Sequence, residues 1–211
     1  MPKIQPFEHY SDEYDSWFDK NSAAYAAELK AIRQLLPTNP ARGMEIGIGS
    51  GKFAEPLGID IGVEPSQQMA DKARKLGIKV LPGVAEQLPF SAAAFDFVLM
   101  VTTICFVDDV IQSFREALRV LKPGGCLLVA YVDVDSELGQ KYLKNREKSR
   151  FYKEATFFST QEILSHLQTA GFGVTQTRQT LIPDAPEATV KEGSGEGAFV
   201  VIRAEKGCNG G

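Results

Sequence analysis

Residues 44–66 read MEIGIGSGKFAEPLGIDIGVEPS, two apolar runs separated by a loop in which glycine stands at every second position. The glycines are Gly47, Gly49 and Gly51, and the acids are Glu45, just before the loop, and Glu64, at the end of the second run. Glycine has no Cβ, so such a loop can adopt strained backbone angles and let a ligand approach the main chain. The two acids indicate that this ligand is not simply a phosphate, because like charges repel in a desolvated site.

Strand-like and helix-like segments alternate along the chain around this stretch. Strands are predicted at 44–48, 58–63, 78–81, 95–101 and 126–132, and helices at 22–36, 66–77 and 109–122. Ser66 suits the N-cap of the second helix, Gly77 suits its C-terminal end, and Asp109 suits the start of the third helix. The alternation predicts an α/β fold, a doubly wound parallel sheet with helices on both faces. Ligands of such sheets bind beyond the carboxyl ends of the strands, where the glycine loop and Glu64 stand.

The regular alternation stops after Val132. Residues 133–158 are charged and helical in pattern, and we expect them to form a lid over the site. A helix at 159–172 and strands at 174–183 and 198–206 are expected to close the fold. The chain is therefore predicted to be one domain over 1–211. Its parts are an N-terminal flap and helix (1–36), a ligand-binding core (40–132), the lid (133–158) and a closing helix and strands (159–205).

Composition favours a small-molecule ligand. The 211 residues carry a formal net charge of −4 without long blocks of one sign, which gives no reason to expect nucleic acid as a partner. The three cysteines, Cys105, Cys126 and Cys208, are odd in number and far apart, so neither disulfides nor a metal site is predicted. We expect a cytoplasmic protein, a monomer or homodimer. No apolar run is long enough to predict a membrane span.

Five short motifs occur in order along the chain. They are EIGIGSG (45–51), VEPS (63–66), AEQLPF (85–90), FDFV (95–98) and RVLKPGG (119–125). Together they resemble the motifs of class I S-adenosylmethionine-dependent methyltransferases, and more narrowly those of the ubiquinone and menaquinone biosynthesis group (methyltransferase type 11). The resemblance implies a Rossmann-like sheet of seven mostly parallel strands with the last strand antiparallel. It also implies S-adenosylmethionine as methyl donor, S-adenosylhomocysteine as product and a small-molecule methyl acceptor.

The resemblance assigns expected roles to residues of this chain. Glu64 would accept hydrogen bonds from both ribose hydroxyls, and Glu45 would orient the loop near the ligand ammonium. The expected cofactor contacts are Glu45, Gly47, Gly49, Gly51, Glu64, Pro65, Ala85, Glu86, Val101, Thr102, Tyr14 and Tyr25. The expected acceptor pocket is formed by Tyr10, Trp17, Thr103, Phe106 and Tyr152. Val84 stands where the family often has Asp, so Ala85 and Glu86 are expected to contact the adenine instead.

Two other functions fit parts of the pattern. A module that binds the nucleoside without catalysis would need the same core. A nicotinamide-dependent oxidoreductase would match GSGKFA (49–54) as GxGxxA, with Glu64 as the ribose acid. Against the oxidoreductase, an acid precedes the first glycine, and residues 52–56 make a poor start for a phosphate-binding helix. Methyl transfer needs alignment of donor and acceptor rather than a dedicated base. No catalytic residue is therefore assigned, and the acceptor atom stays open among N, O, S and C.

Overall fold

The computed structural model describes residues 3–38 and 42–208. Its described strands form one sheet in the order β3-β2-β1-β4-β5-β8-β6-β7. The strands are β1 (Gly43–Ile46), β2 (Ile61–Val63), β3 (Lys79–Leu81), β4 (Phe95–Val101), β5 (Leu121–Val132), β6 (Gly173–Thr180), β7 (Lys191–Glu192) and β8 (Phe199–Glu205). The helices are α1 (Gln5–His9), α2 (Ser11–Lys20), α3 (Ser22–Arg33), α4 (Ala54–Leu57), α5 (Gln67–Lys75), α6 (Val110–Val120), α7 (Glu137–Lys144) and α8 (Thr160–Ala170), with a 3₁₀ turn, η1, at Arg146–Lys148.

Strands β1 to β5 pair in parallel, and β8 lies antiparallel between β5 and β6. This arrangement confirms the predicted Rossmann-like α/β fold with an antiparallel last strand. The described sheet has eight strands where seven were expected. The additional strand, β7, consists of two residues of the loop after β6 that pair with Arg178 and Gln179. Its charged sequence has no strand pattern, and it is ordered by pairing with the edge of the sheet.

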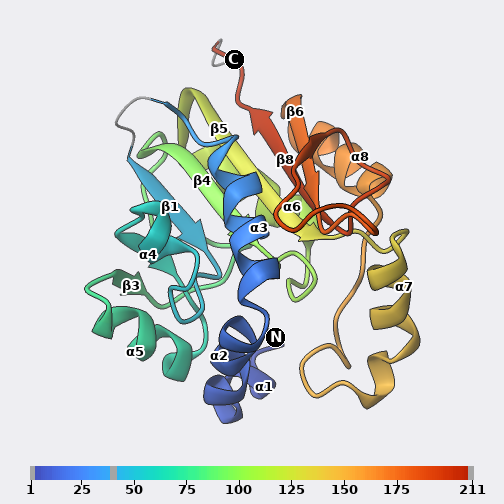
Figure 1. Cartoon of the computed structure of the whole chain (residues 1–211). Helices are drawn as coiled ribbons and strands as arrows, with labels where there is room; N and C mark the ends of the chain where they lie inside the picture. Colours follow the sequence, from blue (N-terminus) through green and yellow to red (C-terminus); the bar gives the residue numbers. More distant parts are fainter. Residues whose placement is uncertain (1–2, 39–41, 209–211) are drawn as a thin grey trace.

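Helices cover the sheet on both faces, as Figure 1 shows. On one face, Phe114 of α6 and Leu167 of α8 pack with strand residues such as Val98. On the other face, Ile32 of α3 and Ala70 of α5 pack with strand residues including Leu99 and Leu128. Because both faces are buried, the central strand β4 is apolar at almost every position, as its sequence indicated.

The predicted helix ends occur where the capping residues stand. The Ser66 hydroxyl accepts a hydrogen bond from Met69 N at the start of α5, and Gly77 follows its end with a φ of +85°. The Asp109 carboxylate accepts a hydrogen bond from Gln112 N, 2.9 Å away, at the start of α6. These helices therefore hold the loops that precede them at one edge of the sheet.

The chain runs from β1 outward through β2 to β3 and then returns to β4 on the other side of β1. The ends of β1 and β4 therefore mark the point where the strand order reverses, which is where such sheets bind ligands. In Figure 1, α1 and α2 (dark blue) and α7 (gold) lie at the lower edge of the molecule, toward which the β1 arrow points. None of the helices in 3–38 and 42–208 combines the length and apolar character that crossing a membrane requires.

Candidate functional site

The three glycines after β1 all have positive φ values, +67° at Gly47, +55° at Gly49 and +84° at Gly51. A Cβ at Gly47 would lie 2.5 Å from the Thr103 side chain, and a Cβ at Gly51 would lie 2.8 Å from Ile78 Cδ1. At Gly49 a Cβ would make only an ordinary contact, at 3.4 Å. Packing and backbone angle therefore both require glycine at 47, whereas at 51 the backbone angle requires it, because the Ile78 methyl group is the far end of a flexible side chain. At Gly49 the requirement comes from the backbone angle and from the cavity that this residue borders.

Glu64, at the end of β2, fixes the glycine loop. Its two carboxylate oxygens accept hydrogen bonds from Gly49 N and from Ser66 N, each at 2.9 Å. Burial raises the pKa of Glu64 to about 7, while the two backbone donors act in the opposite direction. Each oxygen retains a lone pair that can accept a hydroxyl of a ligand.

Glu45, on β1, is 2% exposed, and its Oε2 has no hydrogen-bond partner among the described residues. Burial, followed by the negative charge of Glu64, raises the pKa of Glu45 well above its ordinary value. A sealed carboxyl oxygen without a partner is uncommon in folded proteins, because leaving it unpaired costs about 1 to 3 kcal/mol. Its place beside the loop fits a cofactor that brings a hydrogen-bond donor or a cation.

A cavity lies between the glycine loop, the ends of β2 and β4 and the N-terminal segment. The predicted residues that line it are Gly47, Gly49, Glu64, Pro65, Ala85, Glu86, Val101, Thr102, Tyr14, Thr103 and Phe106. Val84, at the position where the family often has Asp, also lines the cavity, and sequence reasoning did not single out the lining residues Lys3, Ile4, Phe7 and Met69. The aromatic character of the N-terminal segment was the signal that could have indicated Phe7.

Other residues predicted for the site lie elsewhere. Gly51 packs beneath the loop, and the Tyr25 hydroxyl donates to the Lys52 carbonyl. Tyr10 is 41% exposed, and the Arg150 guanidinium lies 4.2 Å from its ring centroid. Trp17 meets Phe18 edge to face, with centroids 5.3 Å apart. The contacts of Tyr25, Tyr10 and Trp17 are with protein groups, which fits aromatic residues that anchor the N-terminal helices.

A second cavity adjoins the first at Thr102, which lines both. Tyr142, Tyr152 and Phe157 form part of its wall, so Tyr152 faces this second space. Thr102 has a φ of +49°, a left-handed angle that is rare for a β-branched residue and that occurs where function demands a set geometry. Cys105 also lines the second cavity, and burial raises its pKa to about 12, which keeps the thiol neutral at pH 7.

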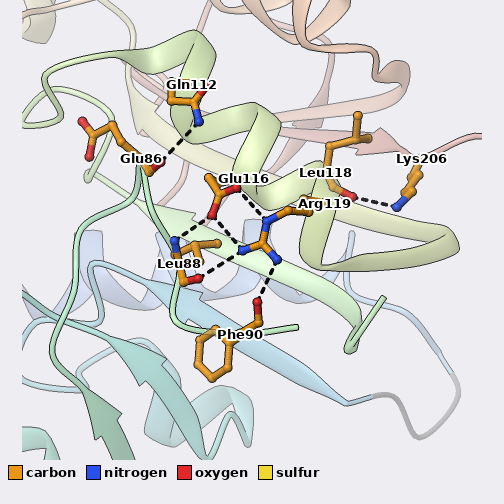
Figure 2. A network of polar contacts seen from close by, with 8 residues as sticks. All are labelled: Glu86, Leu88, Phe90, Gln112, Glu116, Leu118, Arg119 and Lys206. Carbon is orange, nitrogen blue, oxygen red and sulfur yellow. Dashed lines mark hydrogen bonds and ion pairs between the residues drawn. The ribbon is translucent and has the colours of Figure 1, made fainter. Parts of the chain in front are cut away.

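The loop that carries Ala85 and Glu86 is held against α6 by the network in Figure 2. Glu116 accepts a hydrogen bond from Leu88 N at 2.8 Å, and Arg119 donates to the carbonyls of Leu88 and Phe90 at 3.0 and 2.7 Å. The Glu86 carboxylate accepts from the backbone N of Asp109 at 3.1 Å. The Glu86 carboxylate therefore binds the backbone at the start of α6. Helix α6 in turn holds the loop of Ala85 and Glu86 at the wall of the cavity.

The N-terminal helices are tied to the glycine-loop side of the site. Lys72 of α5 lies 2.5 Å from Asp12 and 2.8 Å from Asp15, and the Ser50 hydroxyl donates to Asp15 at 2.5 Å. Glu13 forms an ion pair with Arg150 of the 133–158 segment.

Aromatic rings continue this closure. The Phe151 ring lies 5.7 Å from the Phe7 ring and 5.9 Å from the Tyr14 ring, measured between centroids. The N-terminal segment and the 133–158 segment therefore meet at the first cavity, which Phe7 and Tyr14 line.

The strand order, the glycine loop and an acid at the end of β2 define a class of α/β proteins that bind nucleoside cofactors. The absence of a long helix after the loop and the two buried acids separate this chain from phosphate-binding members of that class.

Comparisons with known proteins identify the family. Residues 44–129 match the model of a methyltransferase domain. An uncharacterized protein of Methanocaldococcus jannaschii is 43% identical over 203 residues, which cover 95% of this chain and 98% of that protein. A crystal structure from Thermotoga maritima, described as a SAM-dependent methyltransferase, possible histamine N-methyltransferase, is 53% identical with a TM-score of 0.91 and covers 95% of this chain and 98% of that one. The ubiquinone biosynthesis O-methyltransferase of Azorhizobium caulinodans is 28% identical over 163 residues, 68% of this chain and 63% of that protein.

The chain belongs to the class I S-adenosylmethionine-dependent methyltransferase family. This finding confirms the resemblance seen in the five motifs. Membership of the family implies S-adenosylmethionine as the cofactor.

Proposed function

We propose that this protein transfers a methyl group from S-adenosylmethionine to a small-molecule acceptor. The observation that carries the proposal is the cavity in which Glu64 and the glycine loop face aromatic side chains of the N-terminal helices. A cavity walled on one side by the N-terminal segment admits a small molecule more readily than a protein or nucleic-acid surface. The Thermotoga maritima structure agrees with this class, because the possible acceptor in its description is a small molecule.

The residues present fit the cofactor. Glu64 would accept the two ribose hydroxyls, and the backbone at Gly47 and Gly49 would approach the ligand closely. The backbone of Ala85 and Glu86 would border the adenine. Burial leaves the free oxygen of Glu45 in need of a donor, which the amino group of the methionine part would supply.

The remaining predicted contacts have a proposed place in the same site. Pro65, Val101, Thr102 and Tyr14 line the cavity and would border the cofactor, while Gly51 and Tyr25 would support the loop from behind. Thr103 and Phe106 would meet the acceptor near the reacting methyl group. Tyr10 and Trp17 would act by anchoring the N-terminal helices.

The bound cofactor supplies a methyl group on a cationic sulfur. The chain's own contribution is to align donor and acceptor and to exclude water. Alignment of the two reactants alone can lower the activation barrier by up to about 7 to 11 kcal/mol. Arg150 and Phe151 contact Glu13 and Phe7 of the N-terminal helices. These contacts would exclude water from the site once both ligands are bound. We propose a cytoplasmic protein, monomer or homodimer, that acts without a nucleic-acid or membrane partner.

Calorimetry and a labelled-methyl assay test the function together. S-adenosylhomocysteine should bind and NAD and NADP should not, and label should pass from the methyl donor to a component of a cell metabolite extract. Nicotinamide binding without affinity for S-adenosylhomocysteine would overturn the proposal. Cofactor binding without transfer to any component of the extract would favour the binding module.

A further inference from the structure

Three aromatic rings beside the cofactor cavity lie almost parallel to one another. The Tyr152 ring, in the 133–158 segment, stacks on the Phe106 ring with centroids 6.0 Å apart and planes 16° apart. It also stacks on the Tyr142 ring of α7, at 5.3 Å and 18°. The rings that surround Phe18 in the N-terminal part of the chain meet it edge to face instead, at 72° to 87°. Tyr152 is therefore the middle ring of a flat stack built from three separate segments.

The middle ring is held by packing alone. The Tyr152 hydroxyl has no hydrogen-bond partner within residues 3–38 and 42–208, and its oxygen is not sealed from the second cavity, which Tyr152 lines. Tyr131, in the wall of the same cavity, by contrast donates a hydrogen bond to Thr160 Oγ1 at 2.9 Å. Residues 150–154 form turns rather than a helix or strand. A rotation about the side-chain bonds of Tyr152 would therefore move its ring without breaking a hydrogen bond.

The place that this ring fills adjoins the cofactor cavity. Thr102 lines both cavities, and Phe106, on which Tyr152 stacks, lines the first. The free space of the second cavity is little more than one water molecule needs. A methyl acceptor fits there only in the place of a side chain, and Tyr152 is the side chain that contacts Phe106.

We propose that the Tyr152 ring occupies the acceptor site in this conformation, and that the acceptor is a small molecule with a flat aromatic ring, which takes the place of Tyr152 against Phe106 and Tyr142. The inference rests on the proposed function. Parallel aromatic walls accept a planar ring in offset stacking, whereas a puckered saturated ring is too thick for such a slot. Tyr152 is then a specificity-determining residue, and its displacement lowers the apparent affinity for the acceptor.

The first test is calorimetry on protein saturated with S-adenosylhomocysteine. The probe is p-cresol, which has the ring of a tyrosine side chain, and its saturated analogue is 4-methylcyclohexanol. The wild type should bind p-cresol at least tenfold more tightly than 4-methylcyclohexanol. Tyr152→Ala should bind p-cresol at least tenfold more tightly than the wild type does, because no ring has to be displaced. Tyr142→Ala removes a wall of the slot and should bind p-cresol at least fivefold more weakly.

The matched control is Tyr152→Phe. It keeps the ring and removes only a hydroxyl without a partner, so it should bind p-cresol within twofold of the wild type. S-adenosylhomocysteine affinity should also stay within twofold in all three variants, because neither Tyr142 nor Tyr152 lines the cofactor cavity. If Tyr152 were only a wall of the pocket, Tyr152→Ala would bind p-cresol more weakly, which is the opposite of the expected result.

The second test identifies the class of the acceptor. In the labelled-methyl assay with a cell metabolite extract, the labelled product should absorb near-ultraviolet light as an aromatic ring does. Added p-cresol should compete with its formation. With the acceptor isolated, Tyr152→Ala should lower the KM for it at least fivefold, and Tyr142→Ala should raise that KM.

The outcomes separate this inference from the proposed function. Failure of the wild type to bind S-adenosylhomocysteine, or to label any component of the extract, would overturn both. Normal transfer to an acceptor without an aromatic ring would overturn the inference alone. So would equal affinity of the wild type for p-cresol and 4-methylcyclohexanol, or weaker binding of p-cresol by Tyr152→Ala.

A measurement on the wild type decides if Tyr152→Ala does not fold. Protein labelled with 3-fluorotyrosine gives a ¹⁹F NMR signal for Tyr152, assigned by its absence from Tyr152→Phe. On addition of p-cresol to the S-adenosylhomocysteine complex, this signal should shift toward that of free 3-fluorotyrosine, because the ring moves out of the stack. An unmoved signal with p-cresol bound would contradict the displacement.

Discussion

Residues that look alike in the sequence have different physical roles at this site. Gly47 and Gly49 both have left-handed backbone angles, but only Gly47 would place a Cβ against Thr103. Gly49→Ala should therefore fold and lose stability by roughly 1 to 2 kcal/mol, the cost of a left-handed alanine. Its affinity for S-adenosylhomocysteine should fall at least tenfold, because a side chain enters the space that the ligand needs. Thermal unfolding and calorimetry measure both effects. Unchanged affinity in the folded variant would place the cofactor elsewhere.

At the scale of elements, α6 holds the loop of Ala85 and Glu86 through Arg119. Arg119→Ala removes two charge-assisted hydrogen bonds to that loop, and we expect S-adenosylhomocysteine to bind roughly tenfold more weakly. The matched control is Arg115→Ala, an exposed position on the same helix, which should bind normally. Equal affinities of the two variants, measured by calorimetry, would show that the network does not position the loop.

The second prediction at this scale concerns the mobility of the N-terminal helices and of the 133–158 segment. They meet through side chains alone: the Glu13 and Arg150 ion pair, the Arg150 guanidinium over the Tyr10 ring, and the Phe151 ring against Phe7 and Tyr14. Both segments should therefore exchange amide hydrogens quickly without ligand and slowly with S-adenosylhomocysteine. Hydrogen exchange measured by mass spectrometry tests this. The amides of β4, in the centre of the sheet, serve as an internal control and should be protected in both states. Equal protection of the two segments with and without ligand would contradict closure.

Sequence reasoning worked best where a local signal decides the structure. The caps at Ser66 and Gly77 and the apolar run of β4 predicted elements that the structure contains. It missed β7, because two charged residues become a strand only by pairing with β6. It also missed Glu28, because a single acid within a helical pattern does not reveal which face is buried. Trp17 and Tyr14 show the same limit, since an aromatic residue that packs and one that lines a cavity look the same in sequence.

At the scale of the whole molecule, buried acids should give the ligand-free protein an unusual pH dependence. Burial raises the pKa of Glu28 to about 8 and that of Glu64 to about 7, so the folded state binds more protons than the unfolded state above about pH 4.5. Stability should then fall as the pH rises from about 5 to 8. Acids whose pKa values are lowered by ion pairs, such as Asp96, act only below this range. Melting temperatures measured across it should decrease, with a smaller decrease in Glu28→Gln; a flat profile would contradict the burial of these acids.

The central claim is that this chain binds S-adenosylmethionine with Glu64 on the ribose, and a double cycle tests it most directly. Calorimetry at pH 8.5, where Glu64 is ionised, compares S-adenosylhomocysteine and its 2′-deoxy analogue on the wild type and on Glu64→Gln. The variant should bind S-adenosylhomocysteine about tenfold to a hundredfold more weakly, the loss typical of a hydrogen bond to a charged group. The 2′-deoxy analogue should bind the wild type weakly and lose less than threefold on going to the variant. Losses that simply add, with no coupling between Glu64 and the 2′-hydroxyl, would contradict the account.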